Sequence, residues 1–339
     1  MTARVPTVLA MRPDVAEAAF PDALRRRLDA VAEVDHTLVL TDFGDPRAAL
    51  ALARAEVLIS GWGCPLVDAA VLDAAPNLRV VVHAAGTVKH HLSPDFWHRG
   101  LAASSAADAN AYPVVQFTLS LILLAGKRAL RMAHEYAAGE YKGRGTARDF
   151  GNVDRTVGVI GASRIGRLLL PLLVREGFRV LLSDPTLSDA DAAGLVPAPH
   201  RVDLVPLDEL LVRSDVVTVH APELPETRHL LDARRLGLLR DGTILVNTAR
   251  GSLIDTEALT RLCAAGRIDA YLDVTDPEPL PPGHPLFALP NVLVTPHLAG
   301  AMGTEVARLG EFAVAEVERF AAGLPLVGAV RASDLTRIA

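Results

Sequence analysis

The sequence predicts an α/β protein of two doubly wound domains, each a parallel β-sheet covered by helices on both faces. Three observations predict this class. Short apolar segments alternate with helical patterns along the whole chain, as expected where crossover helices join parallel strands. The 339 residues are too many for one ordinary core and suit two domains of about 150 residues each. A glycine-rich turn near the middle of the chain opens a second alternating series.

The first series occupies the amino-terminal third of the chain. Its predicted strands are residues 7–11, 35–41, 56–62 and 79–85, and its predicted helices are 13–30, 45–54 and 65–74. One long helix is then expected at 110–140, with Gly126 as the point where it can break. This helix is apolar on more than one face, which favours a buried position with a dimer contact over a membrane span.

The second series begins after that helix. Its predicted strands are residues 156–160, 179–183, 216–220, 243–247, 269–273 and 292–295. A final helix at 303–322 is long enough to return to the first domain. We therefore predict a first domain of residues 1–105, a second domain inserted at 106–298, and a return to the first at 299–339.

Composition excludes several classes of function. A net charge of −6 without a basic cluster argues against binding to nucleic acid or to an anionic membrane surface. The amino-terminal segment is too polar for a signal peptide, and no uninterrupted apolar run reaches about 18 residues. The two cysteines, Cys64 and Cys263, suit a reducing compartment, so we expect a cytoplasmic protein.

The segment "GVIGASRIGRLL" has the layout of a dinucleotide-binding turn, a strand followed by a glycine turn and a helix. Gly161 suits the tight turn, and Gly166 suits close packing of helix on strand. Ser163 replaces the middle glycine, and its hydroxyl could donate to a phosphate oxygen. Arg164 stands where a helix amino terminus favours an anion. The alternative is an ordinary strand–turn–helix connection with two glycines.

The next predicted strand supports the cofactor interpretation. It ends in Asp184, 18 residues beyond Gly166, close to the spacing of the carboxylate that accepts from the adenosine ribose hydroxyls. A carboxylate there repels a 2′-phosphate, so NAD is favoured over NADP. The alternative is a solvated turn aspartate before Pro185.

Chemically capable residues follow three later strands. "ILVNTARGSLID" places Arg250, "YLDVTDPEPL" places Asp273 and Glu278, and "VLVTPHLAG" places His297. Because ligands of open parallel sheets bind at the carboxyl ends of the strands, we expect these residues to converge. Arginine can hold a carboxylate in a bidentate fork, and histidine can transfer a proton near neutral pH, especially beside a glutamate that favours its charged form. Taken singly, Arg250 could be a surface ion-pair residue and His297 a helix-capping one.

The blocks "NTARG", "LDV…EP", "TPHLAG" and "VHAPELPETRHLL" resemble the D-isomer-specific 2-hydroxyacid dehydrogenases, over a stretch from about Leu78 to Gly300. The resemblance implies a Rossmann NAD-binding domain inserted into a flavodoxin-like substrate domain, and a homodimer formed through the nucleotide domain. It also implies that Arg250 grips the substrate, Glu278 partners the histidine, and His297 donates the proton.

The resemblance further implies two sets of binding residues. The positions expected to contact NAD are Gly161, Ser163, Arg164, Ile165, Gly166, Asp184, Pro222, Thr227, Thr248, Ala249, Arg250, Asp273, His297 and Gly300. The positions expected to bind the substrate are Ala85, Gly86, Thr87 and Arg250. Two departures affect the substrate pocket: Val88 replaces the usual aspartate of the substrate loop, and Gln116 replaces a glutamate at the start of the long helix.

Four histidines, His83, His90, His91 and His98, lie close together in the sequence. Their spacing matches no compact metal-ligand pattern, so no metal site is predicted.

The sequence thus predicts an NAD-dependent oxidoreductase that interconverts a 2-keto acid and a D-2-hydroxy acid, with His297 as proton donor and acceptor. The alternative is a non-catalytic, NAD-sensing, corepressor-like protein on the same fold. Formate dehydrogenase is a lesser alternative, disfavoured because Glu278 stands where glutamine is expected.

Overall fold

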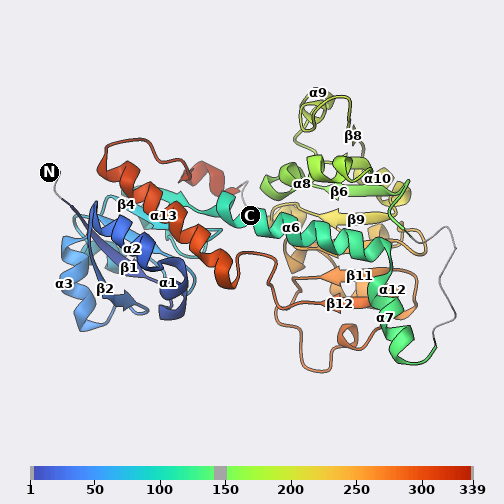
Figure 1. Cartoon of the computed structure of the whole chain (residues 1–339), viewed down its shortest axis with the longest axis horizontal. Helices are drawn as coiled ribbons and strands as arrows, with labels where there is room; N and C mark the ends of the chain where they lie inside the picture. Colours follow the sequence, from blue (N-terminus) through green and yellow to red (C-terminus); the bar gives the residue numbers. More distant parts are fainter. Residues whose placement is uncertain (1–3, 141–150, 337–339) are drawn as a thin grey trace. The chain divides into compact units, whose positions relative to one another are not determined.

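The computed structural model describes residues 4–140 and 151–336 and divides the chain into two compact units (Figure 1). The first unit contains the residues up to Ala111 and those from Ala301 onward, and the second contains Tyr112–Gly300. These divisions fall a few residues from the boundaries at 105 and 298 that the sequence suggests.

The sheet of the first unit has the strand order β13-β5-β4-β3-β1-β2. Its strands are β1 (Val5–Ala10), β2 (Ala32–Leu40), β3 (Val57–Ser60), β4 (Val80–His83), β5 (Ala102–Ser105) and β13 (Ala329–Val330). The first five are parallel in the order 2-1-3-4-5, and β13 adds an antiparallel edge. This is the flavodoxin-like order, so the predicted fold of this domain is confirmed.

Helices cover both faces of this sheet. They are α1 (Pro13–Ala19), α2 (Asp22–Asp29), α3 (Pro46–Arg54), α4 (Ala69–Ala74), α5 (Pro94–His98) and α13 (Val306–Ala321). Alternate residues of β3 point into different cores: Val57 and Ile59 pack with α13, and Leu58 packs with α3 and α4. Two apolar faces on one strand are what a doubly wound sheet requires.

The single helix predicted at 13–30 is wrong. Phe20 leaves the helical region, with φ −120° and ψ 69°, and Pro21 caps a second helix. The ring of a proline disfavours helical geometry in the residue before it, so the chain breaks here. The predicted helix at 65–74 likewise begins only at Ala69, where the side chain of Asp68 accepts from the backbone N–H of Val71.

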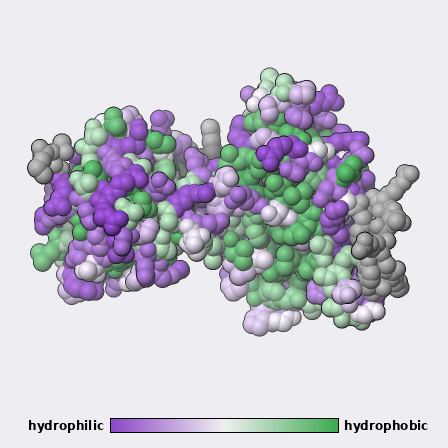
Figure 2. All heavy atoms as spheres, in the orientation of Figure 1, coloured by the Kyte–Doolittle hydropathy of each residue, from purple (hydrophilic) through white to green (hydrophobic). Residues whose placement is uncertain are grey.

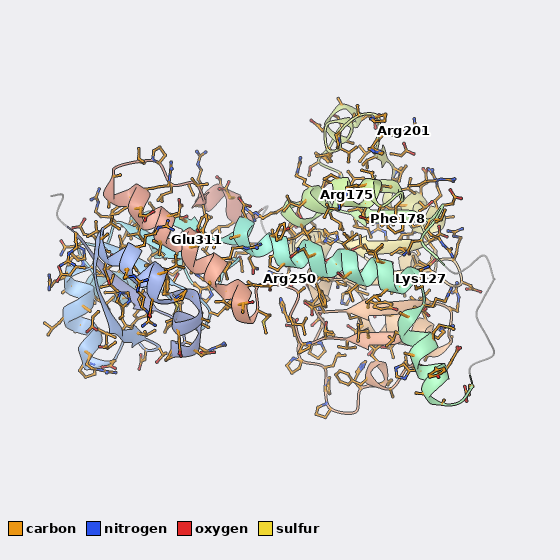
Figure 3. All side chains as sticks on the ribbon, viewed as in Figure 1. Lys127, Arg175, Phe178, Arg201, Arg250 and Glu311 are labelled. Atoms are coloured by element: carbon orange, nitrogen blue, oxygen red, sulfur yellow. The ribbon has the colours of Figure 1, made fainter. Side chains whose placement is uncertain are left out.

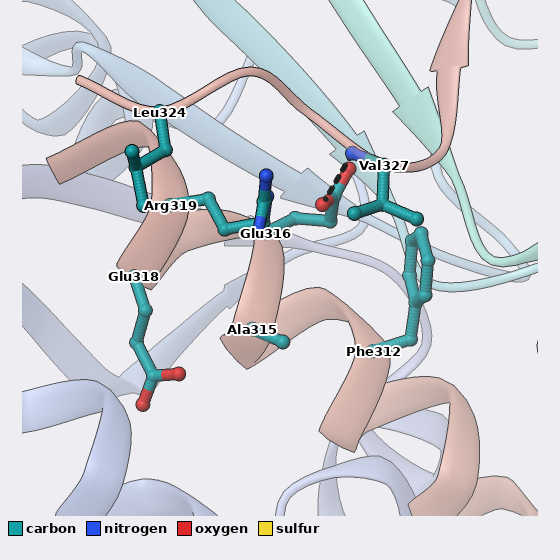
Figure 4. Close-up of a pocket in the computed structure, with 7 residues that line it drawn as sticks. All are labelled: Phe312, Ala315, Glu316, Glu318, Arg319, Leu324 and Val327. Atoms are coloured by element: carbon teal, nitrogen blue, oxygen red, sulfur yellow. Dashed lines mark hydrogen bonds between the residues drawn. The ribbon is translucent and has the colours of Figure 1, made fainter. Parts of the chain in front are cut away.

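A buried carboxylate fixes the returning segment of the first unit. Glu316 of α13 is 1% exposed and accepts hydrogen bonds from the backbone N–H groups of Val327 (2.9 Å) and Gly328 (3.0 Å) and from the hydroxyl of Ser104. This places β13 beside β5. A surface cavity of about 420 Å³ borders these residues (Figure 4).

The sheet of the second unit is wholly parallel, in the order β12-β11-β10-β9-β6-β7-β8. Its strands are β6 (Thr156–Ile160), β7 (Arg179–Ser183), β8 (Asp203–Leu204), β9 (Val216–Val219), β10 (Ile244–Asn247), β11 (Asp269–Leu272) and β12 (Val292–Val294). Counted from β6, the order 3-2-1-4-5-6 is that of the Rossmann fold, with one further strand. The predicted fold class is therefore confirmed, and the order reverses between β6 and β9.

The helices of the second unit are α6 (Ala107–Gly126, which begins in the first unit), α7 (Ala129–Ala137), α8 (Arg164–Arg175), α9 (Asp189–Ala193), α10 (Leu207–Arg213), α11 (Ala233–Leu236) and α12 (Thr256–Ala264). The predicted break near Gly126 is confirmed, because α6 and α7 are separated at Arg128, which has φ 50°. In the described part of the chain, α6 alone is long and apolar enough to cross a membrane. Half of its apolar window is buried, with Leu121 and Ile122 in the core of the unit.

Candidate functional site

The glycine turn after β6 is built by close backbone contacts. Gly161 has φ +93°, and a Cβ on it would lie 2.8 Å from the backbone nitrogen of Ala221, beyond the end of β9. A Cβ on Gly166 would lie 2.2 Å from the carbonyl oxygen of Gly161. Both positions therefore require glycine, one for the turn and one for the close approach of α8 to β6.

Ser163 occupies the middle position of the turn without strain. It caps α8 in ordinary extended geometry, with φ −70° and ψ −171°. Its hydroxyl donates to the carbonyl oxygen of His220 at 2.6 Å, so it binds the backbone after β9. The donor that the sequence offers to a phosphate oxygen is therefore taken by a backbone carbonyl. The first turn of α8, with Arg164 exposed and Ile165 half-buried, still presents a helix amino terminus to an anion.

Asp184 lies against the same turn. Its Oδ2 accepts from the backbone N–H of Ala162 at 2.8 Å. Its Oδ1 accepts from the backbone N–H and the hydroxyl of Thr186, at 2.9 and 2.6 Å. The carboxylate is thus oriented at the end of β7, beside the glycine turn. Sequence reasoning missed Thr186, although a threonine two residues after an aspartate is a common turn signal.

A dinucleotide fits this arrangement. Gly161 lets the turn pack against the backbone of Ala221, α8 directs its amino terminus toward the turn, and a carboxylate stands at the end of the neighbouring strand. The loop after β9 borders the turn. There the hydroxyl of Thr227 donates to the carbonyl of Pro222 at 2.7 Å, so this side chain shapes the loop.

Arg250 is placed by a turn after β10, the strand that ends at Asn247 (Figure 3). Asn247 is buried and bridges the turn: its Oδ1 accepts from the N–H of Ala249 at 3.0 Å, and its Nδ2 donates to the carbonyl of Arg250 at 2.9 Å. Thr248 shares a 2.7 Å hydrogen bond with the hydroxyl of Thr118 in α6. The sequence indicated Arg250 but not Asn247, whose bonds depend on the folded turn.

The guanidinium of Arg250 already makes one hydrogen bond and one ion pair within the protein. Its Nη1 donates to the carbonyl of Ala249 at 2.7 Å, and its Nε lies 4.0 Å from the carboxylate of Glu223. The side chain is 30% exposed. Gly251 follows it, where a Cβ would lie 2.0 Å from the carbonyl of Thr275, so the Arg250 turn packs directly on the loop after β11.

Asp273 organises the loop that carries the histidine. It is 1% exposed, and its carboxylate accepts from the hydroxyl of Thr295 (2.6 Å) and from the N–H groups of Leu298 and Ala299 (both 2.9 Å). Its carbonyl accepts from the N–H of His297 at 2.9 Å. His297 is held in the left-handed region, with φ 53°. Asp273 therefore fixes a backbone conformation that a non-glycine residue rarely adopts, and Gly300 ends this loop.

His297 and Glu278 form a hydrogen-bonded pair, with 2.6 Å between Nδ1 and Oε1. Their side chains are 49% and 43% exposed. No described residue bonds the other ring nitrogen, Nε2, which leaves it available to a ligand. The structure thus brings Arg250, Asp273, Glu278 and His297 together at the carboxyl ends of β10, β11 and β12, in the unit that holds the glycine turn.

The predicted substrate loop follows β4 in the first unit. Ala85 is buried, and its carbonyl accepts from the hydroxyl of Ser105 at 3.2 Å; the same hydroxyl donates to Gly86. Thr87 accepts from the N–H of Lys89 at 3.3 Å. Val88 is 1% exposed and packs in the core of this unit. Gln116 is exposed on α6.

Two of the neighbouring histidines, His83 and His91, pack against each other in the first unit. His83 is 1% exposed, shares a 2.9 Å hydrogen bond with Ser60, and lies 4.7 Å from the ring of His91. Burial lowers the pKa of His83 to about 3. Over residues 4–140 and 151–336, no three His, Cys, Asp or Glu side chains are grouped to hold a metal ion.

The fold and the site define a dinucleotide-binding α/β protein in which a hydrogen-bonded histidine–glutamate pair and an arginine follow neighbouring strands of the nucleotide-binding sheet. Residues 119–299 match the family model described as "D-isomer specific 2-hydroxyacid dehydrogenase, NAD binding domain". The chain belongs to this family.

Relatives of known name agree with that assignment. The chain is 35% identical over 262 residues to D-3-phosphoglycerate dehydrogenase of Mycobacterium tuberculosis, covering 74% of this chain but 47% of that protein. It is 33% identical over 251 residues to glyoxylate reductase of Thermofilum pendens, covering 73% of each. The chain spans about half the length of the D-3-phosphoglycerate dehydrogenases it matches.

A solved structure shows the same fold. D-Lactate dehydrogenase with NAD⁺ from Lactobacillus jensenii has a TM-score of 0.81 to this chain at 18% identity, covering 96% of this chain and 99% of that one.

Proposed function

We propose that this protein is an NAD-dependent dehydrogenase that interconverts a 2-keto acid and a D-2-hydroxy acid. The observation that carries the proposal is the 2.6 Å contact between His297 and Glu278, in the same unit as the glycine turn and Arg250. Bound NADH supplies the hydride that reduces C2 of the keto acid. The non-catalytic alternative has no support among the relatives named above, all of which are enzymes.

His297 donates and accepts the proton of the reaction. Glu278 binds Nδ1 and orients the ring, so that the protonated form presents its Nε2–H to the carbonyl oxygen of the keto acid. When the carbonyl is reduced, this proton passes to the oxygen, which becomes the hydroxyl. In the oxidative direction, the neutral ring takes the proton back.

Arg250 anchors the substrate. The guanidinium can bind the carboxylate through the nitrogens that face the ligand, and its positive charge polarises the adjacent carbonyl. This orients C2 while His297 approaches the carbonyl oxygen. The family resemblance also implies that the Ala85–Thr87 loop of the first unit binds the substrate carboxylate.

The first experiment is a screen of NADH oxidation with glyoxylate, hydroxypyruvate, pyruvate, phenylpyruvate and branched 2-keto acids. We expect at least one to be reduced to its D-hydroxy acid. Arg250→Ala should lower kcat/KM by about 10²–10³ through both KM and kcat, because a carboxylate anchor acts in ground and transition states. The matched control is Arg201→Ala, which removes an 83%-exposed arginine of the same unit. NADH binding without reduction of any acid would refute the enzyme.

Cofactor choice provides a second test. Asp184 stands at the end of β7 with its carboxylate held beside the turn, so NADH should be preferred over NADPH. Asp184→Ala should narrow the preference. Equal kcat/KM for the two cofactors in the unmodified protein would contradict this assignment.

The assembly and compartment belong to the same proposal. A homodimer formed through the second unit is supported by α7, which has no buried residue and leaves Tyr136 72% exposed, and by Leu124 of α6, which is 52% exposed. Figure 2 shows hydrophobic residues on the surface of the second unit. Sedimentation velocity should give a mass of two chains. Two buried free thiols, Cys64 and Cys263, suit a reducing cytoplasm, and no nucleic acid or membrane partner is proposed.

A further inference from the structure

Arg250, the proposed anchor of the substrate carboxylate, has an acidic neighbour that the proposed reaction does not use. Glu223, in the loop after β9, lies with its Oε2 4.0 Å from Nε of Arg250. Its Oε1 accepts a hydrogen bond from the hydroxyl of Ser252, two residues beyond Arg250. We propose that Glu223 selects 2-keto acids with a single negative charge and rejects those with a second anionic group, an inference that rests on the function proposed above.

The position of Glu223 is fixed from both sides. On its own loop, Thr227 donates to the carbonyl of Pro222 and accepts from the N–H of Leu224, closing the backbone around Glu223. The loops are also joined to each other: the N–H of His229 donates to the carbonyl of Ser252 at 2.8 Å, and that of Leu231 to Leu253 at 3.0 Å. These hydrogen bonds hold the loop of Glu223 beside the turn of Arg250.

Each arginine in the described parts of these two loops lies within ion-pair distance of a carboxylate. Arg250 faces Glu223 at 4.0 Å, and Arg228 pairs at 3.2 Å with Asp276 of the loop after β11. A monoanionic keto acid needs one cation, and the Nη groups of Arg250 provide it. A second anionic group finds a carboxylate instead of another cation.

The size of the substrate makes this repulsion unavoidable. A small keto acid is only a few atoms long, so its second charge remains within about 10 Å of Glu223, the range over which charges interact at 0.1 M salt. Because the repulsion scales with the charge of the substrate, a dianion loses more than a monoanion. Specificity of this kind comes from a group that disfavours the wrong ligand.

Two matched pairs of acids test the proposal: 2-oxopentanoate with 2-oxoglutarate, and hydroxypyruvate with its 3-phosphate. Each pair differs mainly in one anionic group. In the unmodified protein the singly charged member should have the higher kcat/KM. Glu223→Gln keeps the acceptor for Ser252 but removes the charge, and should raise the relative kcat/KM of the more highly charged member about fivefold to tenfold.

Glu226→Gln is the matched control, since it removes an exposed carboxylate of the same loop that has no contact with Arg250. In Glu226→Gln, the ratio of kcat/KM between the two acids of each pair should equal the ratio in the unmodified protein. In the unmodified protein, this ratio should also move toward unity as salt is raised to about 0.5 M.

The outcomes separate the two levels of the proposal. Suppose that a singly charged acid is reduced, but that Glu223→Gln changes both kcat/KM ratios by less than twofold from the unmodified protein, or by no more than Glu226→Gln does. The role of Glu223 is then refuted, and the proposed dehydrogenase activity is not. Preference of the unmodified protein for the more highly charged acids also refutes it. If no 2-keto acid is reduced with NADH, the proposed function itself fails.

Discussion

The two ends of β11 each carry a buried aspartate, and the two are held in different ways. Asp269 begins the strand and forms ion pairs with Arg128, at 3.2 Å, and with Arg131, which tie α6 and α7 to the sheet. Asp273 follows the strand and has no ion pair among the described residues. It accepts instead from two backbone N–H groups and the hydroxyl of Thr295.

This difference separates the tasks of the two edges of the sheet. At the amino edge, burial raises the pKa of Asp269 despite its two arginines, and the pairing holds helices in place. At the carboxyl edge, hydrogen bonds to Asp273 shape the loop that presents His297. One edge therefore serves mainly stability, and the other places chemical groups.

The largest effect is expected at the carboxyl edge. His297→Ala removes the proton donor and should lower the rate of keto acid reduction by about 10²–10⁴, which corresponds to roughly 3–5 kcal/mol of barrier. Stability and NADH binding should be unchanged, because the side chain is half exposed. Steady-state kinetics, urea unfolding and calorimetric titration of NADH measure the three quantities. His200→Ala, an exposed histidine of the same unit, is the control. Near-normal turnover in His297→Ala would end its assignment as proton donor.

The paired variants Asp269→Asn and Asp273→Asn should have opposite profiles. Asp269→Asn leaves two arginines uncompensated and should lower the free energy of unfolding by about 3–5 kcal/mol, with kcat/KM preserved while the protein is folded. Asp273→Asn sets an N–H₂ group against N–H donors; it should cost about 1–3 kcal/mol and lower kcat/KM at least tenfold. Urea unfolding and kinetics at a temperature where both variants are folded give the comparison. Equal losses of activity in the two would abolish the distinction between the edges.

Much of this architecture could be predicted from the sequence. The predicted strands at 156–160 and 179–183 coincide with β6 and β7, because each has an apolar, β-branched or leucine-rich centre and is followed by a turn residue, Gly161 or Asp184. The convergence of Arg250, Glu278 and His297 followed from strand ends alone. Three strands were not predicted. The segment "AASS" of β5 has no β-branched or aromatic residue, and β8 and β13 have only two residues each.

Other features depend on contacts between distant residues. The segment "DAYLDV" does not show that one aspartate meets arginines and the other meets N–H groups. The partner of the Ser163 hydroxyl is a carbonyl 57 residues away. Glu223 lies beside Arg250 only because two loops pair through backbone hydrogen bonds. Strand order brings elements together, whereas side-chain direction is decided by packing after they meet.

A smaller effect is expected for the exposed ion pair at the carboxyl edge. Glu278→Gln keeps an acceptor for the Nδ1–H of His297 but removes the negative charge. Reduction should slow by about twofold to fivefold without loss of NADH binding, as expected for a half-exposed pair. Because this pair is more exposed than that of Asp269, high salt should bring the rates of Glu278→Gln and the unmodified protein closer together. Equal steady-state rates of the two proteins at low salt would refute the role of Glu278.

The smallest effect is expected at the glycine turn, also on the carboxyl edge. The hydroxyl of Ser163 already donates to the carbonyl of His220, and the backbone of Ser163 is unstrained. We therefore expect that NAD binding does not require the serine side chain. Ser163→Gly loses one hydrogen bond and gains freedom in the unfolded chain, which should cost about 1 kcal/mol of stability. It also removes a Cβ where the backbone approaches the pyrophosphate, so NADH should bind equally or slightly more tightly. Ser163→Ala separates the two contributions, since it keeps the Cβ and loses the hydroxyl. Calorimetric titration of NADH with the three proteins decides the matter. If both variants lose more than tenfold in affinity, the hydroxyl must leave His220 to bind phosphate, and this position would belong to the cofactor site as a direct ligand.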